Sequence, residues 1–258
     1  MKTSLILLFF LSLTGRAFAR QTGDVPEKQN KISIGLGYAQ YKDENLHPKA
    51  FRGLSLHVAY FHSVERRTIS EYSFGLNTSF LNTRYESFPG AYGLSLNGNY
   101  HYLFPVAGND RWHYFIGPAA GFQYGTHAFF NWDESHLYFA NYLGGGVSNR
   151  LIYNFDKRSI VFDVGIPLLA VIFRPSPNRL YKIDDMTFGG IIKNLAGNPE
   201  FALPNHHFDI NVRLEYRLKT SKRKSSSVAY NFRYHFMQAN GGEPYRNVTQ
   251  TLSYQFFF

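Results

Sequence analysis

The sequence predicts an all-β protein, a closed antiparallel up-and-down transmembrane β-barrel of about ten strands. Three observations predict this fold class. Large apolar or aromatic residues recur at every second position, the spacing at which side chains of a strand share one face. Aromatic residues make up 18% of the chain, yet its mean hydropathy is only −0.28. After residue 20 there is no apolar run of the roughly 20 residues that a spanning helix needs.

The alternation defines the expected strands in order. In the first strand, Ile32 and Ile34 share a face opposite Ser33 and Gly35, and the clearest case is FDINVRLEYRL at residues 208–218. Each strand is near the roughly 9 to 11 residues that a tilted membrane strand requires. The expected strands cover residues 32–39, 54–60, 71–80, 94–102, 112–124, 137–153, 160–168, 208–218, 228–236 and 248–258.

The two faces of these strands differ in chemistry. One is large and aromatic, and the other carries Gly, Ser, Asn and charges of both signs. An aromatic face suits lipid and a polar face suits a hydrated lumen, and only a closed barrel satisfies every backbone group in hydrocarbon. A secreted soluble β protein that binds a ligand inside an inverted barrel is the alternative, since it would also alternate.

The connections alternate between short and long. Short turns fall at SVERRT, VAGNDR, NFDKRS and KTSKRKSS, which we assign to the periplasmic end. Most of the opposite connections are longer, as membrane barrels require: residues 43–53, 83–91, 125–136, 173–206 and 238–247. The apolar loop 173–206 is expected to cover the barrel mouth as a plug or to form a short helix.

Residues 1–19 are predicted to be a secretory signal peptide, which leaves 20–258 as the barrel domain. Lys2 supplies the positive start, LILLFFLSL the apolar stretch and AFA the cleavage site. Removing Lys2 and Arg16 lowers the net charge from +9 to +7. The chain has no cysteine, so disulfides and cysteine-based zinc sites are excluded.

Charged side chains on the polar face are candidates for a lumen network. A barrel of eight strands is filled by side chains whereas open porins use 16 to 18, so ten strands predict a narrow or plugged lumen with paired charges. A selectivity lining or a transport path is the other interpretation. The network is expected to contain Glu71, Arg150, Asp163, Asp209, Arg213, Glu215, Arg217, Arg233 and His235.

The last strand carries the sequence's most specific motif. Its alternating aromatic residues Tyr254, Phe256 and Phe258 resemble the assembly signal of bacterial outer-membrane β-barrel proteins. The segment VGIPLLAVIFRP and the Tyr-rich N-terminus are similar to uncharacterised small barrels of the Bacteroidetes type. This resemblance implies export to the outer membrane of a Gram-negative bacterium, a porin-like architecture and contact with the barrel-assembly machinery.

The same resemblance sets the expected partners, which are outer-membrane lipid and lipopolysaccharide rather than nucleic acid. Basic loop residues can bind lipopolysaccharide phosphates, or they can be ordinary solvated charges; both interpretations stay open. The residues concerned are Lys49, Arg52, Arg84, Arg174, Arg179, Lys182, Lys193 and Arg246.

Catalytic motifs are weaker. The lipid A deacylase and outer-membrane phospholipase families place a serine two residues after the histidine. Here the residue two positions after His235 is Met237, whose thioether cannot attack an ester. Omptin-type proteases use Asp and His at the outer rim, so His207 with Asp209 gives an alternative hydrolase function. Adjacent His206 and His207 point to opposite faces and are poor joint metal ligands. We therefore expect no metal, no cofactor and no catalysis. The expected role is a narrow or plugged channel, or a structural protein that interacts with lipid or with the cell surface.

Overall fold

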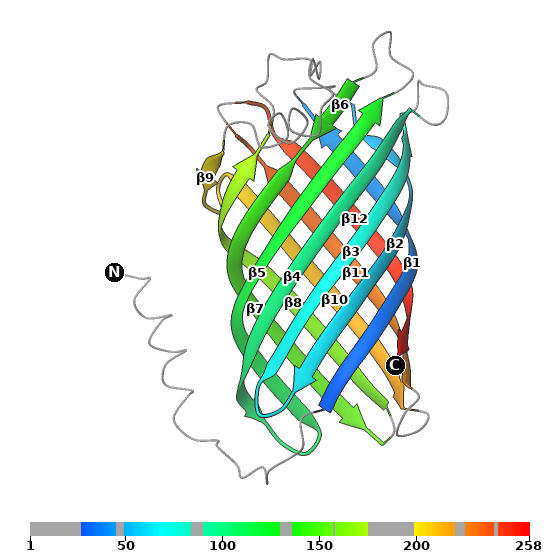
Figure 1. The fold of residues 1–258 in the computed structure, drawn as a ribbon, viewed down its shortest axis with the longest axis vertical. Helices are drawn as coiled ribbons and strands as arrows, with labels where there is room; N and C mark the ends of the chain where they lie inside the picture. Colours follow the sequence, from blue (N-terminus) through cyan, green and yellow to red (C-terminus); the bar gives the residue numbers. More distant parts are fainter. Residues whose placement is uncertain are drawn as a thin grey trace.

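The computed structural model describes residues 27–44, 49–83, 90–129, 136–156, 158–174, 199–219, 225–239 and 242–258. Ten antiparallel strands close into a barrel, which confirms the predicted fold class (Figure 1). The barrel strands are β1 (Glu27–Asp43), β2 (Phe51–Glu65), β3 (Ile69–Asn82), β4 (Ala91–Gly108), β5 (Trp112–Phe129), β7 (Asn141–Phe155), β8 (Arg158–Phe173), β10 (His207–Lys219), β11 (Ser225–Met237) and β12 (Tyr245–Phe257).

Two short strands extend this wall. β6 (His136–Phe139) pairs with β5, and β9 (Glu200–Ala202) pairs with the end of β8. Among the described residues, we find no helix long and apolar enough to cross a membrane. The predicted signal peptide, residues 1–19, and most of the predicted plug, residues 175–198, lie outside the described residues.

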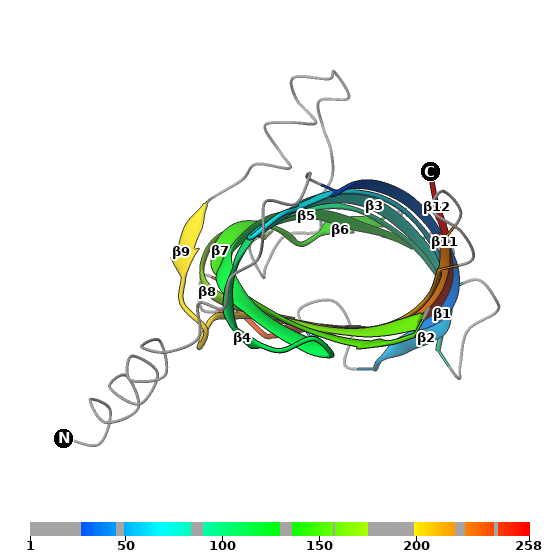
Figure 2. The ribbon, with the colours of Figure 1, turned by 90° about the horizontal axis from the view of Figure 1, so that it is seen from below.

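Neighbouring barrel strands pair in chain order, and two further pairings close the ring seen in Figure 2. β12 pairs with β1, where Tyr254 lies opposite Ile34, and β10 pairs with β8, where Leu214 lies opposite Phe162. Both pairings are antiparallel, so each strand runs against its two neighbours around the ring. The up-and-down topology therefore follows the order of the alternating segments in the sequence.

The strand expected over residues 137–153 is divided into β6 and β7, and the other barrel strands are longer than the alternation predicted. They contain 13 to 18 residues, whereas crossing a bilayer needs roughly 9 to 11. β1, for example, was expected over residues 32–39 but extends over Glu27–Asp43. Backbone pairing continues where the apolar pattern stops, because the ladder itself does not depend on side-chain polarity. The extra residues at the loop end include most of the inward-facing rings described below.

The outer surface of the barrel is apolar, as the alternation predicted. Along β1, Leu36 is 67% exposed while Ser33 is 0% exposed, and the neighbouring strands repeat this pattern. Strands also approach closely in places: a Cβ on Gly53 would lie 1.8 Å from the carbonyl oxygen of Phe80, so that only glycine fits there. Apolar side chains thus lie on the outside of the wall, and small or polar side chains such as Ser33 face the lumen.

The predicted assembly signal lies on the outside of the closing strand. Tyr254, Phe256 and Phe258 are exposed, and the Phe258 amide donates a hydrogen bond to the Asn30 carbonyl at 3.0 Å. Phe257, on the other face, lies 5.6 Å from the Lys31 ammonium. The C-terminus is therefore part of the wall, while its role as an assembly signal stays a prediction.

Candidate functional site

The lumen contains three successive zones, which we describe from the short-turn end to the loop end. The first is an ionic layer, formed by Lys31, Glu65, Glu71, Arg150, Asp163, Arg213, Glu215 and Arg217. The second is a polar chamber. The third is an aromatic layer, formed by Tyr41, Phe51, Phe129, Tyr138, Tyr142, His207, His235 and Tyr245.

Arg150 of β7 bridges the lumen in the ionic layer. Its Nη2 lies 2.8 Å from Oε1 of Glu71 on β3, and its Nε lies 2.6 Å from Oδ1 of Asp163 on β8. β3 and β7 are not neighbours in the barrel, so the contact with Glu71 crosses its interior. Both Arg150 and Glu71 are almost fully buried, which makes this bridge part of the filling of the lumen.

Glu215 is the second centre of the ionic layer. Its carboxylate is 0% exposed and accepts hydrogen bonds from Arg213, from Nε of Arg217 at 2.9 Å and from the hydroxyl of Ser227 at 2.9 Å. The Lys31 ammonium on β1 lies 3.4 Å from the same carboxylate. A buried carboxylate surrounded in this way compensates charges that come from two different strands.

Sequence reasoning missed Lys31, which the structure buries completely. It precedes the first clean alternation and reads as a polar strand end. Its position has the same parity as Ser33 and Gly35, however, so the face was readable once the strand was extended backwards. The ammonium also lies 4.9 Å above the Phe61 ring, a cation–π geometry that favours its charged form in a site away from water.

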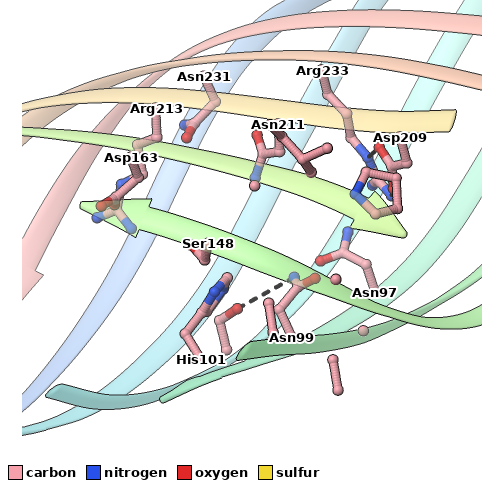
Figure 3. Close-up of a pocket in the computed structure, with 18 of the residues that line it drawn as sticks. Asn97, Asn99, His101, Ser148, Asp163, Asp209, Asn211, Arg213, Asn231 and Arg233 are labelled. Atoms are coloured by element: carbon pink, nitrogen blue, oxygen red, sulfur yellow. Dashed lines mark hydrogen bonds and ion pairs between the residues drawn. The ribbon is translucent and has the colours of Figure 1, made fainter. Parts of the chain in front are cut away.

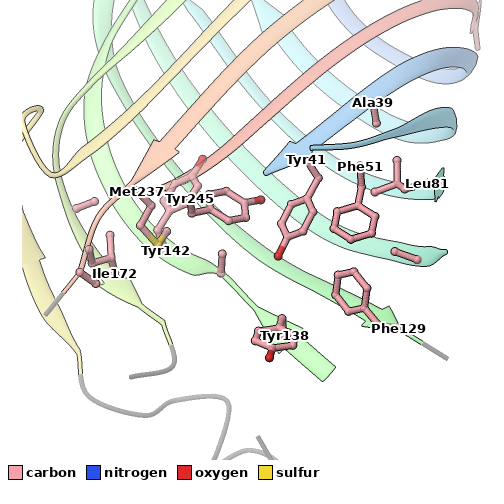
Figure 4. Packing of buried hydrophobic residues seen from close by; sticks show 14 of the residues in the cluster. Ala39, Tyr41, Phe51, Leu81, Phe129, Tyr138, Tyr142, Ile172, Met237 and Tyr245 are labelled. Atoms are coloured by element: carbon pink, nitrogen blue, oxygen red, sulfur yellow. The ribbon is translucent and has the colours of Figure 1, made fainter. Parts of the chain in front are cut away.

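The aromatic layer differs from the polar lumen that the sequence predicted. Tyr41 of β1 stacks on His127 of β5 with ring centroids 3.8 Å apart. Phe51 packs edge-on against Phe129 at 5.1 Å (Figure 4). On the other side, Tyr245 contacts Tyr41 at 5.5 Å. These inward rings contact one another instead of water, so the loop end of the lumen is filled by apolar packing.

Asp209, Arg233 and Tyr142 join three strands at the border of the aromatic layer. Nε of Arg233 donates to Oδ1 of Asp209 at 2.7 Å, Nη2 of Arg233 lies 2.7 Å from the Tyr142 hydroxyl, and that hydroxyl donates to Asp209. The predicted network residues therefore fall into two groups, because Asp209 and Arg233 bind here and not in the ionic layer.

His207 and His235 lie beside this triad. The His207 ring packs at 4.5 Å from Tyr142 and 5.3 Å from His235, and both histidines are 1% exposed. Within the described ranges, none of their ring nitrogens has a hydrogen-bond partner. The structure thus places His207 and Asp209 in the same inward zone, with Asp209 already bound by Arg233. His206 instead lies exposed at the rim, 3.9 Å from Glu200.

One predicted loop cation has a different position. Arg174, expected to be a solvated or phosphate-binding residue, is buried and donates to Asp43 at 2.5 Å and to the carbonyl of Glu243 at 2.5 Å. It ties the end of β8 to the end of β1 through Asp43 and to the connection before β12 through Glu243. Arg84, Arg179, Lys182 and Lys193 lie outside the described residues.

Other rim charges are paired near the start of the first long connection. Glu44 follows β1 and accepts hydrogen bonds from Lys42 and Arg246, both at 2.8 Å. The hydrogen bond from Lys42 holds the pKa of the Glu44 carboxyl below its usual value. Arg246 is therefore engaged within the protein, whereas Arg52 is exposed and available to solvent.

The chamber between the two layers has a volume of about 190 Å³. It is lined mainly by amides, hydroxyls and glycines, with charged pairs toward its ends (Figure 3). Such a volume has room for on the order of ten waters. In the parts of the chain described, no group of three or more His, Cys, Asp and Glu residues could hold a metal ion. The amide residues that line the chamber are Asn77, Asn97, Asn99, Asn211 and Asn231.

Comparison with known proteins finds similarity in shape only. No family model and no curated protein matches the sequence. The outer membrane protease OmpT from Escherichia coli aligns with a TM-score of 0.49 at 7% identity, covering 93% of this chain and 99% of that one. The translocator domain of the autotransporter NalP from Neisseria meningitidis aligns at 0.43 and 7% identity, covering 99% and 95%.

A third similar structure has a lower TM-score. The attachment invasion locus protein Ail of Yersinia pestis aligns with a TM-score of 0.32 at 13% identity, covering 90% of this chain and 99% of that one. All three are bacterial outer-membrane barrel structures. At these identities and scores, a function has to be argued from the residues of this chain.

Proposed function

We propose that this protein is an integral barrel of the bacterial outer membrane, without catalytic activity, whose lumen is plugged by its own side chains. The observation that carries the proposal is the bridge from Glu71 to Arg150, which crosses the barrel interior in a buried ionic layer. The aromatic layer fills the other end of the lumen. A solute moving through the barrel would have to displace both layers.

The exposed belt supports a membrane location. Large apolar side chains such as Leu36, Leu54 and Leu252 point outward, and a continuous surface of this kind is stable in lipid but not in water. An inverted soluble barrel would place these residues inside. Export by a signal peptide, assembly through the C-terminal strand, and contact with lipopolysaccharide are further parts of this proposal.

The geometry does not favour the alternative hydrolase. A water-activating pair must reach a water molecule next to the substrate. Here the Asp209 carboxylate is bound by Arg233 and Tyr142, and the His207 ring is buried against Tyr142. The same residues have a simpler role, in which they hold β7, β10 and β11 together below the rim.

Conductance across a planar bilayer tests the plug. The wild-type barrel should show no steady open current. Replacing the bridge with Glu71→Ala and Arg150→Ala, together with Tyr41→Ala and Phe129→Ala in the aromatic layer, should give a steady current. Thr78→Ala on β3, which leaves both layers intact, is the matched control. A wild-type protein that conducts like an open pore would refute the plugged lumen.

Membrane integration is tested separately by extraction. The protein should stay with the membrane fraction through high salt and carbonate, and only detergent should release it. Release without detergent would contradict the barrel's location whatever the bilayer recordings show.

A further inference from the structure

The pairing between β8 and β10 is interrupted within the wall. All of β10, residues 207–219, pairs with β11, but only residues 211–218 pair with β8. At its other end β8 pairs with β9 instead, through residues 170–172. In the described strands, there is therefore no backbone pairing between residues 166–169 of β8 and residues 207–210 of β10. We call these two segments the β8–β10 seam.

The local sequence explains the interruption. Pro167 has no backbone N–H and is disfavoured inside a sheet. The register of β8 against β7 also shifts next to it, leaving Leu168 without a partner. This bulge turns Leu168 and Leu169 outward together, each 49% exposed. A bulge bends its strand and weakens the ladder locally. At residues 166–169, the pairing of β8 is therefore irregular along its edge with β7 and absent along its edge with β10.

The chain on the other side of the seam also leaves the wall. Residues 203–206 form a turn between β9 and β10, in which the amides of His206 and His207 donate to the Leu203 carbonyl at 2.9 and 2.8 Å. Figure 2 shows β9 outside the ring of barrel strands. β9 and β10 thus follow one edge of β8 but are separated by an outward turn at the seam.

The chamber reaches the seam from inside. Its lining includes Gly165, Ile166 and Pro167 from β8 and Asp209 and Asn211 from β10. A Cβ added to Gly165 would meet no atom within 4 Å, so open space adjoins the wall at this point. Asn211 is exposed although it lies on the same face as Asp209. Gly165 and Asn211 form the last backbone pair before the seam, so the open part of the chamber borders the interrupted ladder directly.

The lining indicates which polar group fits the chamber. Its carboxylates are matched in number by its guanidinium groups, and each is already paired: Asp163 and Glu71 with Arg150, Asp209 with Arg233, and Arg213 with Glu215. The remaining polar side chains are mostly amides and hydroxyls, which both donate and accept hydrogen bonds. His101 adds a buried ring nitrogen, Nδ1, that has no partner in the described chain. Uncharged hydroxyl groups match such a lining.

We propose that the seam is a lateral entry through which the chamber binds an amphiphile with a small, uncharged, hydroxyl-rich head and an alkyl tail. The head occupies the chamber, and the tail stays in the seam against Ile166, Leu168 and Leu169. The chamber is smaller than the roughly 300 to 1,000 Å³ of sites that enclose drug-sized ligands, so it holds the head alone. The inference rests on the proposed function, because a lumen closed at both ends leaves the seam as the route.

Binding of octyl β-D-glucoside, below its micellar concentration, tests the site on full-length protein held in amphipol. Native mass spectrometry should show one saturable molecule on the wild type. Gly165→Leu places a side chain in the open space beside the seam and should weaken binding at least about tenfold. Thr78→Leu, which adds bulk on the lipid-facing side of β3, should bind as the wild type does. Equal binding to wild type and Gly165→Leu, or no saturable binding, would overturn the proposal.

Hydrogen exchange on the unmodified protein in nanodiscs tests the seam without a ligand. Amides of residues 207–210 that point toward β8 should exchange faster than those of residues 211–218, and octyl β-D-glucoside should slow them. Uniform protection along β10 would overturn the lateral entry and leave the plugged lumen standing. Conversely, a conducting wild type with a fast-exchanging seam would refute the proposed function alone.

Discussion

Replacing Glu215 by glutamine should destabilise the barrel strongly while keeping its shape. The ionic layer balances the cations Lys31, Arg150, Arg213 and Arg217 against the carboxylates Glu65, Glu71, Asp163 and Glu215. Glu215→Gln leaves one uncompensated positive charge in this buried layer. The cations Lys31, Arg213 and Arg217 lose the carboxylate that they share. The amide oxygen of the new glutamine can still accept the hydrogen bond from the Ser227 hydroxyl.

The magnitude follows from the geometry. At about 4 Å and an effective dielectric constant of about 20, one pair of unit charges attracts by roughly 4 kcal/mol. Part of this is offset because the carboxylate was desolvated on folding, and breaking a buried pair by removing one partner costs about 3–5 kcal/mol in measured cases. The unfolding equilibrium should therefore shift by between about a hundredfold and a few thousandfold.

Denaturant unfolding in lipid vesicles, followed by circular dichroism and by heat-dependent gel mobility, measures this loss. A second change, Arg213→Gln, restores the charge balance, so Glu215→Gln with Arg213→Gln should recover part of the stability as a positive coupling. Glu44→Gln at the rim is the control and should leave the unfolding midpoint near wild type. A Glu215→Gln protein within about 0.5 kcal/mol of wild type would refute the charge-balance reasoning.

Three further outcomes are expected. Arg174→Ala removes charged hydrogen bonds to Asp43 and to the Glu243 carbonyl, so the free energy of unfolding should fall by about 1.5–3 kcal/mol; an unchanged denaturation midpoint would contradict the buried position of Arg174. Deleting Phe258 should lower the membrane-inserted fraction in cells, whereas Phe258→Tyr should restore it, and normal insertion without Phe258 would count against the assembly signal. Gly53→Ala should lower the free energy of unfolding by about 1–3 kcal/mol because its Cβ meets the Phe80 carbonyl oxygen at 1.8 Å. Gly165→Ala should leave it nearly unchanged because open space adjoins this position. If thermal unfolding showed Gly165→Ala to be the less stable variant, the close approach of β2 and β3 at Gly53 would be refuted.

The fold was predictable because each strand contains its own signal. The alternation of Ile32, Ser33 and Ile34 sets the faces of β1 without knowledge of any other strand. Strand ends were not predictable in this way, because pairing continues beyond the apolar belt. Tyr41 shows the consequence: it has the parity of Ser33 and faces the lumen, but it lies past residue 39, where the clean pattern stops.

For the candidate site, the sequence predicted which charged residues face the lumen but not which of them contact one another. Inward charges such as Glu71 and Arg150 follow from parity, but their contact depends on strand tilt and on which strands face each other across the closed ring. Neither quantity can be read from one strand. The β8–β10 seam was missed for a related reason, since Pro167 is visible in the sequence but the ladder that it interrupts is formed with residues far along the chain.

The ionic layer also bears on how the barrel forms. Its charges come from both halves of the chain: Lys31 lies on the first strand, whereas Glu215 lies on β10, and their contact exists only after β12 has paired with β1. An unclosed sheet would keep Lys31 apart from the carboxylate that neutralises it, with both groups held close to lipid. Ring closure and charge neutralisation are therefore coupled, so the same side chains that fill the finished lumen penalise a barrel that has not closed.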